Sequence, residues 1–206
     1  SVFIVGDGHQ RIYGKNKVVL GQCGIDIRGR SARLKINYRT SEEIRVFAQN
    51  ILKHSDIDDL DDGTTKTLGD KSVFSGPKPQ GIPCDNDQAE IDAVLAWVTT
   101  QIEEKGLAPH EICIVPTKSK VSYELEGAGY GTYKLTREVD PGPSHRGVRT
   151  GTMYRIKGLQ YRAVAMLCSK PGDIINRLES ASQQERCLLY VTATRAREEL
   201  LVTVRG

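Results

Sequence analysis

The chain of 206 residues is long enough to bury a hydrophobic core, and its length fits one main domain with room for an appendage. Its hydrophobic content of 38% is ordinary, and no apolar run approaches the roughly 18 residues that span a bilayer, which argues against an integral membrane protein. The formal net charge of +3 is too small to indicate nucleic-acid binding by itself. The first residues lack the pattern of a secretory signal, and the native N-terminus of the protein can lie elsewhere.

The charge is unevenly distributed along the chain. From Lys134 to Arg162 there are seven Lys and Arg residues but only two acidic residues, a local excess of five positive charges. The opposite run, Asp56–Asp62, is strongly acidic and is most simply explained as a solvated loop. The distribution, rather than the net charge, therefore bears on nucleic-acid binding.

The five cysteines are scattered. They form no C-x-x-C pair and have no histidine nearby at ligand spacing, which argues against both a zinc site and a disulfide framework. We expect reduced and mostly buried thiols. The residues are Cys23, Cys84, Cys113, Cys168 and Cys187.

The first predicted elements are two buried strands and a helix. Val2–Val5 is a continuously apolar run closed by glycine, which is typical of a strand buried on both faces of a parallel sheet, and Leu34–Ile36 is expected to be another. Thr40 is predicted to cap a helix over Ser41–Leu52, with Glu43 completing a capping box. The apolar face of this helix consists of Ile44, Phe47, Ala48 and Ile51.

The next segment reads as a loop, a strand and a long helix. His54 to about Gly76 is acidic and rich in turn residues, which predicts a loop, and Gln80–Cys84 is expected to be a strand. A helix is expected to begin at Asn86 or Asp87 and to end before Gly106, which stands at the position of a C-cap glycine. Its apolar residues fall at helical spacing: Ile91, Val94, Leu95, Val98 and Ile102.

The remaining pattern alternates between strands and helices. Strands are predicted at Glu111–Pro116, Gly131–Leu135, Val148–Met153, Tyr161–Leu167 and Leu200–Val204, and helices at Lys118–Glu126 and Ser182–Glu198. Alternation of this kind predicts an α/β fold with a doubly wound parallel sheet flanked by helices.

Polar clusters are expected beyond the carboxyl ends of the strands, where open α/β sheets collect their functional residues. These clusters are Gly6–Gln10, Asn37–Arg39 and Thr150–Thr152 with Lys157 and Gly158; a fourth, Thr194–Arg197, is expected near the end of the last helix. Arg39 and Arg195 are candidates for phosphoryl transfer, because that transition state spreads charge over oxygens and needs positioned donors. Composition alone also allows ordinary surface or ion-pair arginines at both positions.

A chain that binds nucleotide by itself should carry a Walker A loop, and this sequence has none. The stretch Gly127–Gly131 lacks the Lys-Ser/Thr ending and is better explained as a helix end and turn. No Asp-Glu pair closes an apolar strand either, so no residue of this chain is predicted to bind a metal. The sequence therefore predicts phosphate-contacting arginines without a phosphate cradle.

Four stretches resemble, in order and spacing, the C-terminal motifs of superfamily 1 DNA helicases of the UvrD/Rep/PcrA type. Val5–Tyr13 (VGDGHQRIY) is similar to motif III, VGDxxQxIY, and Leu34–Ser41 (LKINYRTS) to motif IV, LxxNYRS. Thr152–Tyr161 (TMYRIKGLQY) is similar to motif V, TxHxxKGLEF, and Glu185–Arg197 (ERCLLYVTATRAR) to motif VI, ERRLLYVAxTRAR. The match is specific because it is collective.

The resemblance implies half of a two-domain motor. In this family ATP lies between two RecA-like domains, and the first carries Walker A and holds most of the Mg²⁺ ligands. Residues 1–30 would be the tail of the first motor domain with a linker, and residues 31–206 would be the second RecA-like domain. The whole protein would be a cytoplasmic, nucleoid-associated, ATP-dependent DNA helicase, and this fragment alone would be inactive.

The resemblance also implies roles at the nucleotide. Gln10 would sense the γ-phosphate, and Tyr38 would stack against the adenine. Arg39 and Arg195 would contact the γ-phosphate and stabilise the charge that develops in the transition state. Gln160 would bind the nucleotide at the ribose, where its amide keeps hydrogen-bonding ability.

A second set of implied roles concerns DNA. Tyr13 would stack on a base of single-stranded DNA. Thr152, Tyr154 and Lys157 would face the DNA backbone, together with the basic strand pair, which consists of the predicted strands Val148–Met153 and Tyr161–Leu167. The implied partners are single-stranded DNA or a duplex junction, and the N-terminal motor domain of the same parent chain.

The sequence also departs from the family pattern. Tyr154 stands where motif V usually has histidine, Gln160 stands where it has glutamate, and Gly14–Asn16 replaces an aromatic residue and its R-G-A continuation. These departures favour an alternative, a non-catalytic helicase-derived module that binds DNA or a protein. Retention of both candidate arginines favours a working motor. A third hypothesis is an α/β domain that works without a nucleotide.

Overall fold

The described part of the chain is built around a six-stranded sheet. The computed structural model describes residues 12, 23–25, 35–53, 70–168 and 181–205. In sheet order the strands are β3 (Gln80–Cys84), β8 (Ala196–Arg205), β7 (Tyr161–Cys168), β4 (Ile112–Val115), β6 (Val148–Thr150) and β5 (Thr132–Lys134). All neighbouring strands of this sheet run parallel, which confirms the predicted fold class.

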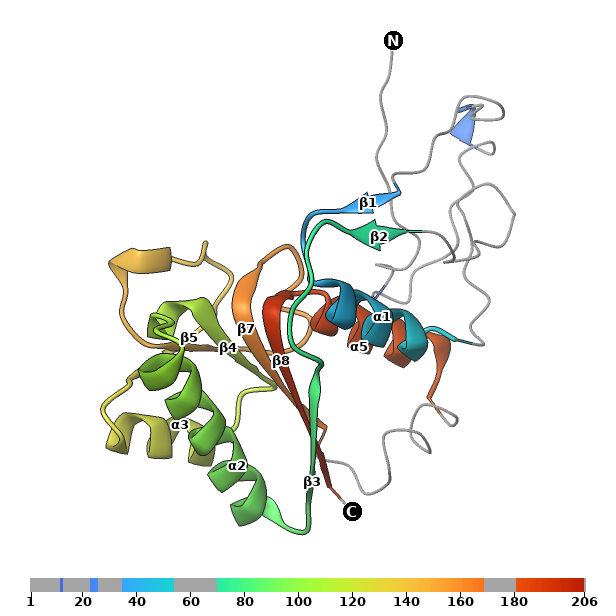
Figure 1. Cartoon of the computed structure of the whole chain (residues 1–206). Coiled ribbons are helices and arrows are strands. Elements are labelled where there is room, and N and C mark those ends of the chain that lie inside the picture. The colour runs from blue at the N-terminus through green and yellow to red at the C-terminus, as the bar shows by residue number, and fades with distance from the viewer. Residues whose placement is uncertain (1–11, 13–22, 26–34, 54–69, 169–180, 206) are drawn as a thin grey trace.

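Helices cover both faces of the sheet (Figure 1). One face carries α1 (Glu42–Ile51) and α5 (Gln183–Ala193), and the other carries α2 (Asp87–Thr99) and α3 (Ser119–Gly127). Each face has its own core, because alternate residues of a strand point to opposite sides. In β4, Cys113 and Val115 belong to the core under α1 and α5, whereas Ile112 and Ile114 belong to the core under α2 and α3.

Helix α1 is present as predicted, but its cap is different. Ser41, not Thr40, is the N-cap, and its hydroxyl accepts a hydrogen bond from the N–H of Ile44 at 3.4 Å. Glu43 does not complete a capping box, because its carboxylate accepts from the N–H of Gly76 at 2.7 Å. That partner is distant in the sequence, so local spacing does not reveal it.

Helix α2 begins and ends where the sequence indicates. The side chain of Asn86 accepts from the N–H of Ala89 at 2.9 Å, which identifies Asn86 rather than Asp87 as the cap. The helix continues as a π-helical turn over Thr100–Glu104. Gly106 follows with φ +68°, so the prediction of a glycine at the helix end is confirmed.

The last predicted helix is too long. Helix α5 ends at Ala193, and β8 begins at Ala196 rather than at Leu200. The early start of β8 follows from its pairing with β7, in which Ala196 lies opposite Tyr161. Strand pairing across the sheet thus overrides the helix-favouring composition of this stretch.

The strand predicted near Leu34–Ile36 is not part of the main sheet. β1 (Ile36–Asn37) pairs in parallel with β2 (Lys71–Ser72) in a separate two-stranded sheet. Ile36 is 55% exposed, so the expectation of a strand buried on both faces is wrong here. The other predicted N-terminal strand, Val2–Val5, lies outside the described residues.

The glycine-rich stretch Gly127–Gly131 closes α3 and leads into β5. Gly129 and Gly131 have φ values of +85° and +66°, which residues with a Cβ rarely adopt. The stretch therefore forms a helix end and a turn, as expected from its lack of a Walker A ending.

The cysteines are all free thiols, and four are buried while Cys23 is exposed, as the sequence predicts. Within the ranges that the structure describes, no three His, Cys, Asp or Glu side chains are grouped so that they could hold a metal ion. None of the helices in those ranges is long and apolar enough to cross a membrane.

Candidate functional site

Three of the predicted site residues meet at the amino ends of β7 and β8. Gln160 directly precedes β7, and Arg195 directly precedes β8. The side-chain amide of Gln160 donates to the carbonyl oxygen of Arg39 at 2.7 Å, and the N–H of Tyr161 donates to the carbonyl oxygen of Arg195 at 2.9 Å. Motifs that are far apart in the sequence are thus joined at the amino-terminal ends of two neighbouring strands.

The segment Asn37–Ser41 reaches the amino ends of β7 and β8 from the two-stranded sheet. Asn37 folds back on the turn, because its Oδ1 accepts from the N–H of Arg39 at 2.7 Å and its Nδ2 donates to Thr40 Oγ1 at 2.8 Å. The N–H of Ser41 donates to the carbonyl of Arg197 in β8 at 2.9 Å. The expectation that the Asn37–Arg39 cluster lies beyond a carboxyl end of the main sheet is therefore wrong, because the strand that precedes it belongs to the smaller sheet.

The two candidate arginines have different surroundings. Arg39 is exposed, and its neighbour Tyr38 is 71% exposed. Arg195 is only 2% exposed, and its guanidinium donates to the carbonyl oxygens of Val191 at 3.0 Å and Leu159 at 3.4 Å. The cation of Arg195 thus lies between a carbonyl in the last turn of α5, where a helix favours positive charge, and a carbonyl of the β6–β7 connection.

The β6–β7 connection carries the predicted DNA contacts. Met153, Ile156 and Leu159 recur every third residue and pack against the core under α1 and α5. The intervening side chains of Thr152 and Tyr154 are exposed, the latter by 42%, and Lys157 is half-buried. Thr152 follows the carboxyl end of β6, as predicted, and its hydroxyl accepts from the N–H of Arg155 at 3.1 Å.

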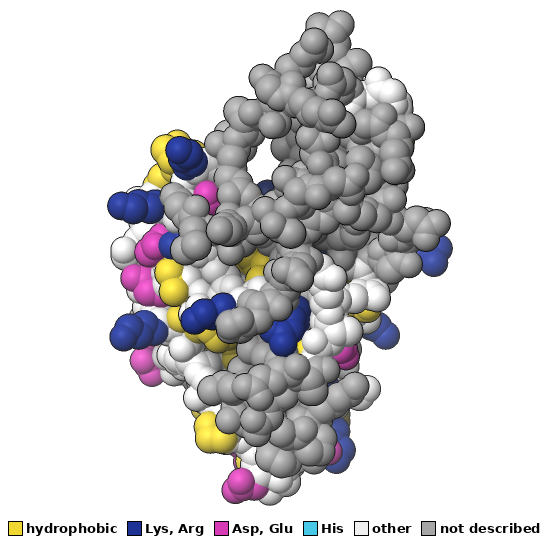
Figure 2. All heavy atoms as spheres, turned by 90° about the vertical axis from the view of Figure 1, so that its right-hand side faces the viewer, with side chains coloured by type: hydrophobic (Ala, Val, Ile, Leu, Met, Phe, Trp, Pro, Cys, Tyr) yellow, Lys and Arg dark blue, Asp and Glu magenta, His cyan; other side chains and the backbone are white. Residues whose placement is uncertain are grey.

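Not all of the basic strand pair is available to a DNA backbone. Arg149 is fully buried and donates to Asp140 at 2.9 Å, and Arg162 pairs with Glu198 at 2.8 Å. The expectation that the whole strand pair faces DNA is therefore wrong for Arg149, whereas Arg162, whose side chain is 39% exposed, stays a prediction. On the face drawn in Figure 2, the described Lys and Arg side chains near the left margin lie among Asp and Glu side chains.

The buried cluster around Arg149 holds the loop between β5 and β6. The guanidinium of Arg149 also donates to the carbonyls of Gly142, His145 and Gly147 at 2.6, 3.0 and 2.7 Å, and lies 5.0 Å from the centroid of the Tyr133 ring. Sequence reasoning missed this cluster. The Pro and Gly residues signalled only a loop, and no spacing indicated that an arginine of the following strand would anchor it.

Asp140 is the acidic partner in that cluster. It accepts from the hydroxyl of Tyr161 at 2.7 Å and from the N–H of Gly142 at 3.0 Å, in addition to Arg149. Burial alone would raise the pKa of Asp140, but these donors outweigh it and hold the pKa below its ordinary value. Burial in turn raises the pKa of Tyr161, so its hydroxyl stays protonated and donates.

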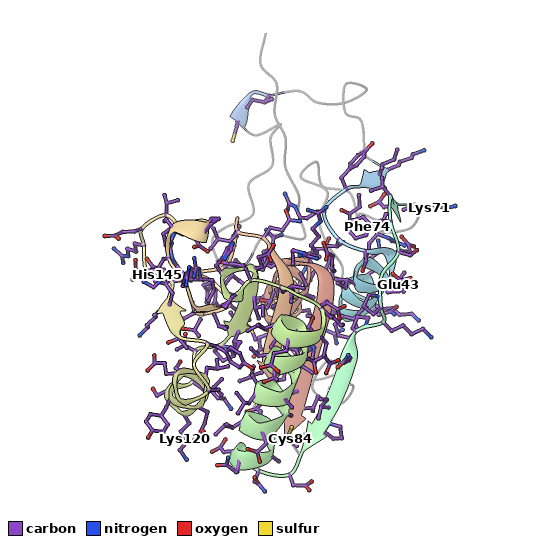
Figure 3. The ribbon with its side chains drawn as sticks, turned by 60° about the vertical axis from the view of Figure 1, so that its left-hand side comes forward. Glu43, Lys71, Phe74, Cys84, Lys120 and His145 are labelled. Carbon is purple, nitrogen blue, oxygen red and sulfur yellow. The ribbon has the colours of Figure 1, made fainter. Side chains whose placement is uncertain are left out.

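The N-terminal turn of α1 binds β2 and the segment that follows it (Figure 3). Glu42 accepts from the N–H of Ser72 at 2.8 Å and pairs with Arg45, which lowers the pKa of Glu42 to about 2. Arg197 of β8 lies over the ring of Phe74, with 5.9 Å between its guanidinium carbon and the ring centroid. Figure 3 shows Phe74 and Glu43 on the same side of the molecule.

Two predicted site residues, Gln10 and Tyr13, lie outside the described residues. Among those described, exposed Tyr38, Arg39 and Gln160 offer an aromatic face, a cation and an amide on adjoining segments. An aromatic ring, a cation and an amide are the types of group that contact the base, phosphates and ribose of nucleotides. The same ranges contain no acidic cluster that could hold Mg²⁺.

Comparisons with known proteins point to a fold. No protein-family model matches the sequence, and a search of curated proteins finds no significant match. A solved structure described as the C-terminal domain of a possible DNA helicase from Lactobacillus plantarum WCFS1 matches with a TM-score of 0.55 and 19% identity. The match covers 82% of this chain and 88% of that chain. At this identity the likeness shows that the chain has the fold of such a domain.

Proposed function

We propose that this chain is the second RecA-like motor domain of an ATP-dependent DNA helicase or translocase of the UvrD/Rep/PcrA type. The observation that carries the proposal is that Arg39, Gln160 and Arg195, from motifs IV, V and VI, are joined at the amino ends of β7 and β8. The likeness to the C-terminal domain of a possible DNA helicase supports it. In this proposal residues 1–30 belong to the first motor domain and its linker.

The nucleotide side of the mechanism depends on residues at the amino ends of β7 and β8 and in the adjoining segment. ATP, with Mg²⁺ held mainly by the first domain, would be hydrolysed by transfer of its γ-phosphoryl group to water, with ADP as the leaving group. Arg39 and Arg195 place positive charge against the γ-phosphate, where charge develops in the transition state. Tyr38 stacks on the adenine, Gln160 lies beside the ribose, and Gln10 senses the γ-phosphate.

Closing of the two domains would change the setting of Arg195. Its guanidinium is bonded to the carbonyls of Val191 in α5 and Leu159 in the β6–β7 connection in this structure. Closure would exchange these acceptors for phosphate oxygens, which form stronger, charge-assisted hydrogen bonds. The exchange makes the site complete only in the closed state, so the first domain alone and this chain alone hydrolyse little ATP.

The DNA side uses the β6–β7 connection. Thr152 and Tyr154 are exposed, and Lys157 is at the surface of the same turn. Together with Tyr13 they contact single-stranded DNA through its backbone and through stacking on bases, without reading sequence. Because Gln160 ends this connection, DNA and nucleotide residues share one short segment, so closure at one site shifts the other.

The test is ATP hydrolysis by the full-length protein, comprising this chain and an upstream ATP-binding domain. Arg195→Ala and Arg39→Ala should each lower the DNA-stimulated rate by about 10³-fold or more, with ATP binding largely kept. Lys120→Ala, an exposed change on α3 across the sheet, is the control and should leave the rate unchanged. An unchanged rate in Arg195→Ala would overturn the proposal.

That outcome would favour the second candidate, a non-catalytic helicase-derived module that binds DNA or a protein. The burial of Arg195 and the substitutions at Tyr154 and Gln160 favour this candidate. It predicts DNA binding or partner binding that does not respond to ATP.

A further inference from the structure

One dipeptide contacts both candidate arginines. The side chain of Gln160 bonds to the carbonyl of Arg39 at 2.7 Å, and the N–H of the next residue, Tyr161, bonds to the carbonyl of Arg195 at 2.9 Å. The start of β7 is therefore the shared support of the two segments that would present cations to phosphate.

The backbone of Arg39 is held by side chains on both sides. Its N–H donates to Asn37 Oδ1 at 2.7 Å, and its carbonyl accepts from Gln160 Nε2 at 2.7 Å. Arg39 lies in a bend at the surface, outside the helices and strands, so no ladder of backbone hydrogen bonds sets its conformation. These two bonds, together with the bond from Ser41 to Arg197, define the direction in which the Arg39 side chain leaves the backbone.

The bond to the Arg39 carbonyl requires a hydrogen-bond donor at position 160. A carbonyl oxygen only accepts, so its partner must donate. Glutamine has an NH₂ group for this purpose, whereas an ionised glutamate is an acceptor alone and would repel the carbonyl. The glutamine that departs from motif V can therefore make this contact, whereas the ionised glutamate of the family pattern cannot.

We propose that Gln160 is a positioning residue, which sets the Arg39 backbone relative to Arg195 through its bond to the Arg39 carbonyl. The role of the arginines at phosphate rests on the proposed function, whereas the bond itself does not. Loss of the bond frees the peptide group after Arg39 to rotate. Misplacement of a phosphate-contacting cation by about 1 Å costs up to about a hundredfold in rate.

The direct test is hydrogen–deuterium exchange of the 206-residue chain. In Gln160→Ala and Gln160→Glu, the amides of Arg39 and Ser41 should exchange about threefold to tenfold faster, since a net hydrogen bond of ordinary strength is lost. Glutamate should have the larger effect, because it adds repulsion. Exchange in α2 and α3 should stay unchanged, which separates a local effect from unfolding.

The matched control is Gln80→Glu. Gln80 is exposed on edge strand β3. Its substitution by glutamate makes the same change of charge at a position away from Arg39. Exchange at Arg39 and Ser41 that is the same in Gln160→Glu as in the unchanged chain would overturn the proposal.

A kinetic measurement on the full-length protein separates positioning from ribose binding. Positioning predicts that Gln160→Glu lowers kcat by about tenfold or more, whatever the proposed ribose contact adds to the change in KM for ATP. A raised KM with kcat kept would show that Gln160 acts at the ribose alone and would overturn the positioning role. If Arg195→Ala leaves hydrolysis unchanged, the motor proposal fails, and the exchange experiment still decides the role of Gln160.

Discussion

The hydroxyl of Tyr161 donates a hydrogen bond to Asp140 over 2.7 Å. Tyr161 is the first residue of β7, and its N–H also bonds to Arg195. Asp140 and Arg149 anchor the loop between β5 and β6. Tyr161 thereby connects this loop to the amino ends of β7 and β8, where the candidate site lies. Five variants test consequences of this arrangement and of the proposed function.

Tyr161→Phe should weaken the fold most at neutral pH, where Asp140 is ionised, and least at acid pH, where Asp140 is protonated in both chains. The depressed pKa of Asp140 means that its ionised form stabilises the fold above the unfolded pKa of about 3.9, and that this contribution is lost as the pH falls through the folded value. Removing the hydroxyl raises the folded value, so the contribution shrinks and disappears at a higher pH. Urea unfolding between about pH 7 and pH 2.5 should show a loss of about 1 kcal/mol at neutral pH and an earlier acid transition. Tyr133→Phe, which keeps its ring beside Arg149, should behave like the unchanged chain.

Arg149→Met should destabilise the domain by about 3–5 kcal/mol. The substitution leaves Asp140 charged without its cation, and three carbonyls of the loop without a donor. Chemical denaturation measures the loss. Arg146→Met changes an exposed arginine of the same loop and should cost less than about 0.5 kcal/mol. Equal effects of the two variants would contradict the structural role of the buried arginine.

Gly76→Ala should destabilise the domain by about 1–3 kcal/mol through overpacking. A Cβ at this position would lie 3.0 Å from Ser41 Cβ and 3.3 Å from the backbone oxygen of Glu198. The clash would also disturb the N–H bond from Gly76 to Glu43. Gly81→Ala is the matched control, because a Cβ there meets nothing within 4 Å. Thermal melts that rank Gly81→Ala below Gly76→Ala would refute the close packing.

Tyr154→Ala should weaken the binding of single-stranded DNA by the full-length protein by about 1–3 kcal/mol, if the exposed ring stacks on a base. Fluorescence anisotropy with a labelled oligothymidine measures the change. Tyr123→Ala removes another exposed tyrosine, on α3, and serves as the control. A loss of affinity that is equal in both variants would argue against a DNA contact at the β6–β7 connection.

Lys157→Ala should change the salt dependence of the same binding. A lysine that neutralises one phosphate contributes about one unit to the slope of log affinity against log salt, so the slope should become shallower by about 1. Lys120→Ala should leave the slope unchanged. An unaltered slope in Lys157→Ala would place this lysine away from the DNA backbone.

Several elements were predictable because their signals are local. Helix α2 has its cap, its apolar face and its closing glycine within one stretch of chain, and all three are confirmed. The boundary between α5 and β8 was not predictable in this way. Residues after Ala193 favour helix by composition, and only pairing with β7 makes them a strand.

By itself, the sequence determined the alternation of strands and helices and the four motifs, since these depend on residue type and spacing along the chain. Only the tertiary structure decided that Arg39, Gln160 and Arg195 share the amino ends of β7 and β8, because parallel strands pair segments that are distant in sequence. It also decided that Arg149 is buried while Thr152 is exposed. A charge count includes buried and exposed arginines equally, whereas burial depends on the packing of the whole sheet.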